Sequence, residues 1–155
     1  MFSAAAFTNV STDTVDLLGS GYALKTLDWS YEYDGSQFPK QQDAGQQPAH
    51  SFVRRVVVNI TVQLLGSSQS AYWTSRNTFA KAFLVRDGAQ TDYQHGRLTV
   101  TPQGGSAMYL DCNITGLSLP LAFDESAAFL STATVSLRAD RGYWRTVSGD
   151  TVVYF

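Results

Sequence analysis

The stretch "RRVVVNITVQLLGSSQSAYWTSRNTFAKAFL", residues 54–84, changes its hydrophobic period near its middle. From Val56 to Leu64 a valine, isoleucine or leucine occupies every second position, and the positions between them are mostly polar. Successive side chains of a strand point to opposite faces, so this alternation predicts a strand with one face in the core. A slip of one residue in its pairing would expose the whole apolar face.

The second part of the stretch predicts a helix. One of the serines in residues 66–70 can accept hydrogen bonds from the first free amides of a helix. Apolar residues then recur at steps of three and four, so we expect one helix within residues 69–87 that ends near residues 86–87, before Gly88. The face expected to be buried carries Tyr72, Arg76, Phe79, Ala80 and Phe83.

Alternation of the strand type returns on both sides of this stretch. Residues 24–33 place Leu27 and three aromatic residues on one side and polar residues on the other. Residues 96–116 predict a hairpin, in which residues 103–105 turn the chain and Cys112 lies on the inward face.

Residues 129–140 and the terminal "TVVYF", residues 151–155, complete the predicted strands. The fold class expected from these segments is mainly β, a β-sandwich or barrel-like domain with one flanking α-helix that covers one sheet or one end. Because the sequence has neither an internal repeat nor a linker, we expect a single domain over residues 1–155.

One long segment, "DGSQFPKQQDAGQQPAHS" at residues 34–51, has neither period and is too long for a hairpin connection. It cannot bury enough apolar area to order itself, so we predict an assembly loop that orders against an adjacent subunit or the next ring. Glutamine amides suit a wet protein contact, and one phenylalanine can anchor it. A solvated flexible loop is the open alternative. The predicted interface residues are Phe38, Gln41, Gln42, Gln46 and Gln47.

The composition is that of a packed globular protein with few charges. Apolar residues make up 44% and charged residues only 15% of the chain, where about 25% charged is usual, so we expect a partner to cover part of the surface. A net charge of −2 creates no field that attracts a polyanion, which argues against specific nucleic-acid binding. No segment resembles a signal peptide or a membrane helix. Cys112, the only cysteine, excludes an intramolecular disulfide.

No group of residues has the spacing of a catalytic, cofactor or metal site. His50 and His95 lie in polar, loop-like segments, and Asp124–Glu125, the closest carboxylate pair, suits a turn between strands. The glycines of "TPQGGS" join two strands and do not open a helix, so they form no phosphate cradle. We therefore expect no enzymatic activity, no cofactor and no metal. The aromatic residues that fit the core better than a sugar-binding surface are Trp29, Tyr31, Tyr33, Trp73, Trp144 and Tyr154.

In their order, the segments resemble the N-terminal ring domain of the distal tail (Dit) proteins of long-tailed bacteriophages. That family has an R-x-V-x-I strand leading through a polar break into a helix, then a G-x-L-x-V strand and a strand of Y-x-x-C character, and a closing corner that ends in tryptophan. The resemblance covers about the last two-thirds of the chain. The similar positions here are Arg55, Val56, Val58, Ile60, Gly96, Leu98, Val100, Tyr109, Cys112, Ala139, Asp140, Tyr143 and Trp144.

The resemblance implies a tail-tube-type domain that assembles into a ring, with a hexamer expected, at the tip of a phage tail. Such rings join the tail tube to the tip or baseplate proteins and leave a channel for the genome. The implied partners are further copies of the chain, the tail tube protein and the tail-tip or baseplate hub proteins. The implied location is the virion, after synthesis in the host cytoplasm. Many relatives carry a second, carbohydrate-binding-like domain, which we expect to be absent because this chain ends at Phe155.

Two alternatives stay open at this point. A tail tube protein, or another ring component of a tail or injection machine, shares a related sheet-plus-helix fold. A ligand-binding β-sandwich or an unrecognised hydrolase would need the same alternation of apolar and polar residues. Mass in solution separates a ring from a monomeric binding module, and the number of copies in the virion separates a tip ring from a tube.

Overall fold

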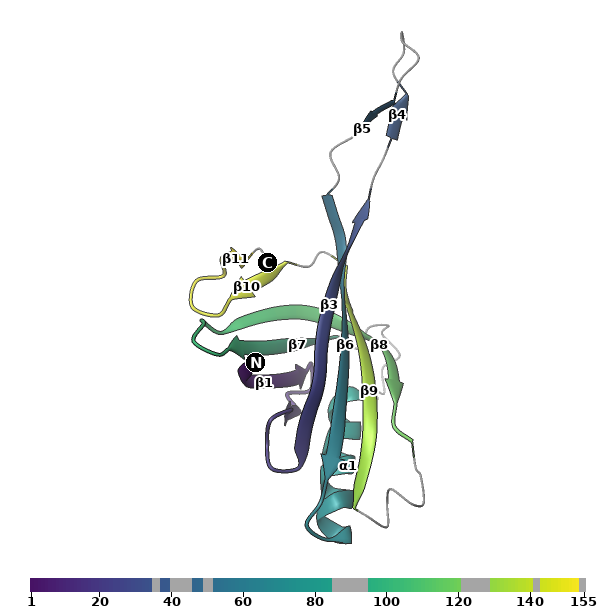
Figure 1. Ribbon diagram of the computed structural model, residues 1–155, viewed down its shortest axis with the longest axis vertical. Helices are drawn as coiled ribbons and strands as arrows, with labels where there is room; N and C mark the ends of the chain where they lie inside the picture. Colours follow the sequence, from purple (N-terminus) through teal and green to yellow (C-terminus); the bar gives the residue numbers. More distant parts are fainter. Residues whose placement is uncertain are drawn as a thin grey trace.

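The computed structural model describes residues 1–34, 37–39, 46–48, 52–84, 95–120, 129–140 and 143–153. It confirms a mainly β domain with one flanking helix (Figure 1). The elements are β1 (Phe2–Asn9), β2 (Thr14–Asp16), β3 (Tyr22–Asp34), β4 (Gln37–Pro39), β5 (Gln46–Pro48), β6 (Phe52–Leu65), α1 (Gln69–Phe83), β7 (His95–Pro102), β8 (Met108–Ser118), β9 (Leu130–Ala139), β10 (Trp144–Thr146) and β11 (Val152–Val153).

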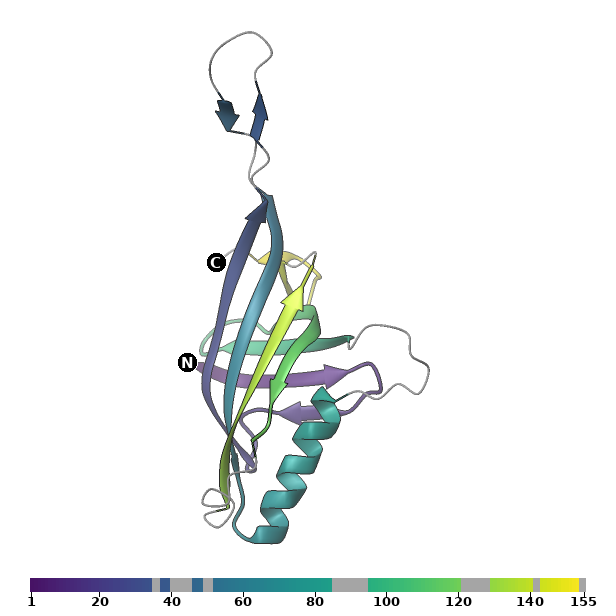
Figure 2. The ribbon, with the colours of Figure 1, turned by 90° about the vertical axis from the view of Figure 1, so that its right-hand side faces the viewer.

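Most of the strands belong to one antiparallel, 9-stranded sheet. Its main path runs β2-β1-β7-β8-β9-β6-β3, and β10 pairs with β8 and β11. We call β1, β2 and β7 the first half and β3, β6 and β9 the second half; Figures 1 and 2 show that their strands cross. β8 belongs to both, because Met108–Asn113 pairs with β7 and Asn113–Ser118 pairs with β9. A register shift between Ile114 and Gly116 lies where it passes between them.

β6 is the central strand of the second half, hydrogen-bonded to β3 on one side and β9 on the other. Its predicted alternation is confirmed, since the apolar series is buried while Asn59 is exposed. Because both neighbouring strands fix its backbone, β6 cannot slip without exposing that series. The buried series is Val56, Val58, Ile60, Val62 and Leu64.

β3 keeps one apolar face although the alternation of its side chains between the two faces shifts by one residue along the strand. Leu24 lies opposite Val62, and Leu27 lies opposite Ile60, so both point to the core with their partners. The extra residue between these pairs is Lys25, at a register shift between Leu24 and Thr26. A bulge of this kind lets one strand carry one residue more than its partner, which restores the inward direction of the apolar residues.

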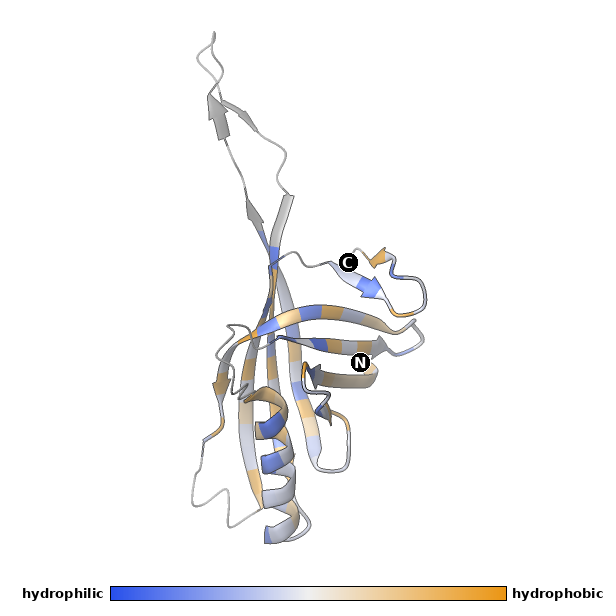
Figure 3. Ribbon diagram, turned by 180° about the vertical axis from the view of Figure 1, so that it is seen from behind, coloured by the Kyte–Doolittle hydropathy of each residue, from blue (hydrophilic) through white to orange (hydrophobic). Residues whose placement is uncertain are grey.

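The helix α1 packs against β6, β1 and β2 and so closes the core between the two halves (Figure 2). Its start is capped by Ser68, whose Oγ accepts a hydrogen bond from the amide of Ala71 at 3.2 Å. Seen from behind in Figure 3, α1 lies in front of the second half and covers the face that Figure 1 hides. Its buried residues are Tyr72, Arg76, Phe79, Ala82 and Phe83, with Ala82 in place of the predicted Ala80.

The helix ends earlier than the sequence predicts. Its last residue is Phe83, and Leu84 leaves the helical conformation with φ −104° and ψ 69°. The predicted end at residues 86–87 and the stop at Gly88 lie outside the described residues. The last carbonyls of α1 accept hydrogen bonds from a side chain of β1, a partner too far away in sequence to be foreseen.

Aromatic side chains connect the two halves through the core at two places. Along α1, the rings run from Tyr22 of β3 through Phe79 and Phe83 to Phe7 of β1, with centroids 6.0, 4.7 and 4.4 Å apart. Near the chain termini, Trp29 of β3 lies 6.4 Å from Phe2 of β1 and 5.5 Å from Trp144 of β10. Ring pairs at these distances add to the stability that burial provides.

The sequence pattern predicts neither β1 nor β2. In β1 the buried Ala5 lies between Ala4 and Ala6, which face the other side of the strand. Three alanines in a row carry no contrast between the two faces, so the period of two is hidden. β2 has only three residues, too few for any period.

The segment at residues 34–51 corrects another expectation. β4 pairs with β5 through Phe38 and Gln47, and these two strands, which we call the arm, project beyond the ends of β3 and β6 (Figures 1 and 2). The prediction that the segment is too long for a hairpin connection is wrong, because the segment joins β3 and β6, which pair as far as Asp34 and Phe52, and it contains a short two-stranded sheet. Strands of three residues pair through their backbones and leave no periodic trace in the sequence. Because Pro39 and Pro48 lack an N–H, they limit pairing of the arm with further strands.

Candidate functional site

The outer face of the second half, opposite α1, carries mostly uncharged polar side chains, interrupted by Ala23 and Val57, and we call it the hydroxyl face. The register forms them into rows across three strands. Thr26, Thr61 and Thr134 make one row. Asp28, Asn59 and Ser136 make the next. The residues of the hydroxyl face are Thr26, Asp28, Ser30, Asn59, Thr61, Gln63, Thr132, Thr134 and Ser136.

No described element covers the hydroxyl face, which Figure 1 views from the side opposite α1. Asn59 and Thr134 are exposed, whereas Thr61 and Gln63 of the central strand are partly buried. The hydroxyl of Ser136 donates a hydrogen bond to Oδ1 of Asn59 at 2.9 Å, which links β9 to β6. The face thus offers hydrogen-bonding groups that carry no charge, apart from the carboxylate of Asp28.

Arginines border the hydroxyl face at its end nearest the arm, and both have carboxylate partners. Arg55 Nε lies 3.2 Å from Glu32 Oε2, and Arg138 Nε lies 3.0 Å from Asp140 Oδ1. Toward the other end, the exposed Lys25 occupies the β3 bulge. Within the described residues, these groups leave the face without an excess of positive charge.

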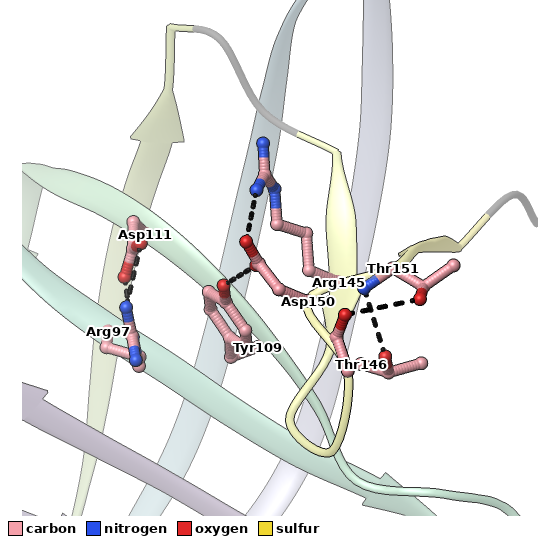
Figure 4. A network of polar contacts seen from close by, with 8 residues as sticks. Arg97, Tyr109, Asp111, Arg145, Thr146, Asp150 and Thr151 are labelled. Atoms are coloured by element: carbon pink, nitrogen blue, oxygen red, sulfur yellow. Dashed lines mark hydrogen bonds and ion pairs between the residues drawn. The ribbon is translucent and has the colours of Figure 1, made fainter.

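The outer face of the first half is different, because it carries a connected network of charges (Figure 4). Arg97 of β7 donates two hydrogen bonds to Asp111 of β8, at 2.7 and 3.0 Å. Its guanidinium lies over the ring of Tyr109, 4.0 Å from the centroid. The Tyr109 hydroxyl donates to Asp150, which also accepts a 2.9 Å hydrogen bond from Arg145 Nη1.

This network ties the β10–β11 hairpin to β8. Hydrogen bonds from Tyr109 and then Arg145 hold the pKa of the Asp150 carboxyl below its usual range. The same bond to Asp150 is the main reason why the pKa of Tyr109 is raised. Because these groups are exposed, solvent screens their attraction and the network adds little to global stability. The amide of Val147 adds a 3.0 Å hydrogen bond to the carbonyl of Ala107.

The buried side chain of Asn9 joins β1 to the C-terminal end of α1. Its Nδ2 donates to the carbonyls of Lys81 and Ala82 at 3.4 and 3.3 Å, and its Oδ1 accepts from the Asp13 amide at 2.9 Å. The ammonium of Lys81 lies 2.7 Å from Asp13, and this hydrogen bond lowers the pKa of Asp13. Asn9 satisfies carbonyls that a helix end leaves without partners. No local sequence signal marks this role.

The residues considered for chemistry lie apart from one another. His95 is the exposed first residue of β7, opposite Asn113, so its expected loop location is wrong because strand pairing begins at this residue. His50 and Asp124–Glu125 lie outside the described residues. In the part of the chain that the structure describes, no cluster of three histidine, cysteine or acidic residues could hold a metal ion. Burial raises the pKa of the Cys112 thiol to about 12.

The aromatic residues serve the core wherever their side chains are described. Trp144 is fully buried, and Trp29, Tyr31 and Trp73 are partly buried and pack against the core. The side chain of Tyr33, and Tyr154 as a whole, lie outside the description. Packing against the core accounts for the four described residues without a sugar-stacking surface.

Of the predicted interface residues, Phe38 lies in β4, and Gln46 and Gln47 lie in β5. Gln41 and Gln42 lie between these strands, outside the described residues. The arm therefore brings three of the five candidates into one two-stranded sheet. Their role in an interface stays a prediction. Among the described helices, none has the length and apolar character needed to cross a membrane.

Comparisons with known proteins find a likeness in structure alone. No protein-family model matches the chain, and no curated protein matches its sequence. Two structures of the phage p2 baseplate in its activated conformation, one with Sr and one with Ca, each contain a chain that matches with a TM-score of 0.58 and 6% identity. Each match covers 86% of this chain and 43% of the other, so this chain spans less than half of that length. The chain is thus similar in fold to a chain of the phage p2 baseplate.

Proposed function

We propose that the chain is a structural protein of a phage baseplate, located in the virion at the tail tip, without enzymatic activity of its own. The observation that carries this proposal is the structural match to a phage p2 baseplate chain over 86% of the residues. The order of sequence segments, which resembles the ring domain of distal tail proteins, supports the same role independently. In this role the protein forms a ring, with a hexamer expected, that joins the tail tube to the baseplate or tip proteins.

The surface supports assembly with other chains. Only 15% of the residues are charged, and several of the described charges are paired within the chain, so much of the surface can meet a protein without desolvating free charges. The main path of the sheet ends in β2 and β3, and a ring covers such strands with the neighbouring copies. These features suit a subunit whose faces are buried on assembly.

The arm is the proposed contact between neighbouring subunits. A two-stranded hairpin alone is at best marginally stable in water, and each strand of the arm has only three residues. A partner surface would stabilise the arm, with Phe38 as an anchor and Gln46 and Gln47 as hydrogen-bonding groups. Replacing residues 36–49 by a short Gly-Ser linker is expected to leave the subunit folded and to weaken assembly. Normal assembly of that variant would show that the arm is not part of the interface.

Electron microscopy of the purified protein, together with sedimentation at micromolar concentration, tests the proposal. We expect class averages of a closed ring and a mass of several subunits. Because some tail proteins assemble only on their neighbours, the same protein is also mixed with purified tail tips. A stable monomer that fails to join the tips would overturn the proposed function.

A tail tube role is the second candidate, since tube proteins have a related sheet-plus-helix fold. The number of copies per virion separates the two roles. A tip ring contributes a few copies, whereas a tube stacks many rings along the tail. Quantitative mass spectrometry of purified virions, with the major capsid protein as the reference, is expected to give only a few copies of the chain per virion.

A further inference from the structure

We infer that Arg76 of α1 holds an acidic side chain of another baseplate protein. This inference rests on the proposed function, because it takes the partner from the assembled baseplate. The site, which we call the Arg76 site, consists of Arg76 and Trp73 of α1 and of Leu119, the residue that follows β8. Its ligand is the carboxylate of an aspartate or glutamate that has apolar neighbours.

Arg76 lies on the buried face of α1, where packing alone favours an apolar residue. Its exposed fraction is 9%, and the other members of this face are tyrosine, phenylalanine and alanine. Arginine is almost never buried to this extent unless it is paired, because its charge loses hydration. The stability of the core therefore does not explain why an arginine occupies this position.

The guanidinium of Arg76 has hydrogen-bonding capacity that the described residues do not use. Its Nη2 donates to the carbonyl of Leu119 at 3.0 Å, whereas Nη1 is buried and has no hydrogen-bond partner. None of the ion pairs among the described residues includes Arg76. Trp73 lies with its ring centroid 5.9 Å from Cζ of Arg76 and gives only a cation–π contact. The described chain thus buries this cation without a carboxylate.

Charge complementarity determines the kind of ligand. The paired N–H groups of a guanidinium match the two oxygens of a carboxylate, and a buried pair is screened much less by salt than an exposed one. Trp73 and Leu119 are only partly buried, so they leave apolar surface beside the guanidinium. An acidic side chain with apolar neighbours can pack on that surface and bind Nη1.

The described acidic residues favour a different protein over a second copy of the chain as the source of this carboxylate. Asp16 already accepts a hydrogen bond from the amide of Leu18, and Asp28 belongs to the hydroxyl face, on the side of the second half away from α1. The acidic residues that lie within ion-pair distance of a cation in their own chain are Asp13, Glu32, Asp111, Asp140 and Asp150.

The experiment measures binding of the purified chain to the remaining tail-tip proteins, produced without this chain. Arg76→Met replaces the guanidinium by an apolar side chain of similar length. The matched control is Arg97→Met, which removes an arginine that is exposed and paired. Asp124→Asn with Glu125→Gln removes the carboxylates nearest in sequence to Leu119. Urea denaturation measures the stability of each isolated chain, and the photo-crosslinker p-benzoylphenylalanine at position 73 identifies the protein that is bound.

We expect Arg76→Met to bind at least about thirtyfold more weakly than the wild type, because one member of a buried charge pair is lost. Its urea midpoint should be unchanged or higher, since an apolar residue replaces an unpaired buried cation. Arg97→Met and the Asp124/Glu125 variant should bind within about fivefold of the wild type. The crosslink from position 73 should lie close to an aspartate or glutamate of another tail-tip protein.

Unchanged binding of Arg76→Met would overturn the inference, and so would a lowered urea midpoint, which would show that the guanidinium stabilises the isolated chain. An equal loss in Arg97→Met would assign the effect to net charge, and an equal loss in the Asp124/Glu125 variant would assign the carboxylate to the chain itself. Crosslinks to copies of the chain alone would make the site a contact between subunits. Failure of the wild-type chain to bind any tail-tip protein would instead overturn the proposed function.

Discussion

The two halves of the sheet have the same interior and different exteriors. Toward the core, both present buried aliphatic and aromatic residues, such as Phe7 and Leu98 in the first half and Ile60 and Leu137 in the second. Toward the outside, the first half carries the Arg97 network, whereas the second carries the hydroxyl face. Packing accounts for the interior, because any apolar side chain of suitable volume serves there. Packing does not account for the outward-facing side chains. These can differ between the halves according to what each outer face contacts.

The substitution with the largest expected effect on stability removes an aromatic contact between the two halves. Phe79→Ala removes a fully buried ring from the aromatic series that runs from β3 to β1, and we expect unfolding to become easier by about 3 to 5 kcal/mol. Urea denaturation followed by fluorescence and circular dichroism measures this loss. Both probes should report a single transition, because both halves depend on the same core. The exposed Asn77→Ala is the control, with an expected change within about 0.5 kcal/mol.

The next prediction compares one asparagine from each half. Asn9→Ala leaves the last carbonyls of α1 without their donor, and we expect a loss of about 1 to 3 kcal/mol in the free energy of unfolding. Asn59→Ala, on the exposed hydroxyl face, is expected to change it by less than about 1 kcal/mol. Equal losses at the two sites in urea denaturation would contradict this difference between a buried and an exposed side chain.

A smaller effect sharpens the contrast between the outer faces. A double-mutant cycle with Arg97→Ala and Asp111→Ala is expected to give a coupling energy of about 0.2 to 1 kcal/mol, because the pair is exposed. The same cycle with Thr61→Val and Thr134→Val should give a coupling that does not depend on salt, since the two hydroxyls lie opposite each other without an ion pair. Thermal unfolding at low and high salt distinguishes the two coupling energies further. Salt should weaken the first coupling and leave the second unchanged.

The smallest effect is local and depends on pH. The pKa of Asp150 is lower in the folded chain than its ordinary value of 3.8, so its contribution to stability is present above that pH and is lost as the pH falls through the folded-state pKa. NMR should show the amides of the β10–β11 hairpin shifting below pH 3.8. Asp150→Asn removes the titrating group, so the hairpin shifts of that variant should be flat. A titration in Asp150→Asn would assign the effect to another group.

The sequence predicts those parts of the fold in which apolar and polar residues alternate sharply. The β6 strand and the buried face of α1 follow directly from the spacing of residues such as Ile60 and Phe79. The hairpin of β7 and β8 follows from its turn, where Gly104 has a φ of 76° that suits glycine. These features are local, since each depends on residues that are close in the chain.

The remaining features depend on pairings between distant segments, which one sequence cannot specify. Nothing near Thr61 indicates that β9 rather than β7 lies beside it, so the rows of the hydroxyl face could not be assembled from the pattern. Nor does the sequence near Asn9 indicate its hydrogen bond to a carbonyl of α1. The contact of Arg97 with the ring of Tyr109 also depends on the pairing of two strands. The polar residues were visible in the sequence, but their common face required the register of three strands.

The register shift in β8 has a consequence for the evolution of the chain. Between Ile114 and Gly116, one strand changes its neighbour from β7 to β9 and carries an irregularity at the junction. An insertion or deletion inside a regular strand turns every later side chain to the opposite face, but one at an existing bulge can be absorbed there. A change of length at this junction would therefore leave the side-chain directions on either side of it unchanged. Each half could then change its outer face without disturbing the strand pairing of the other half.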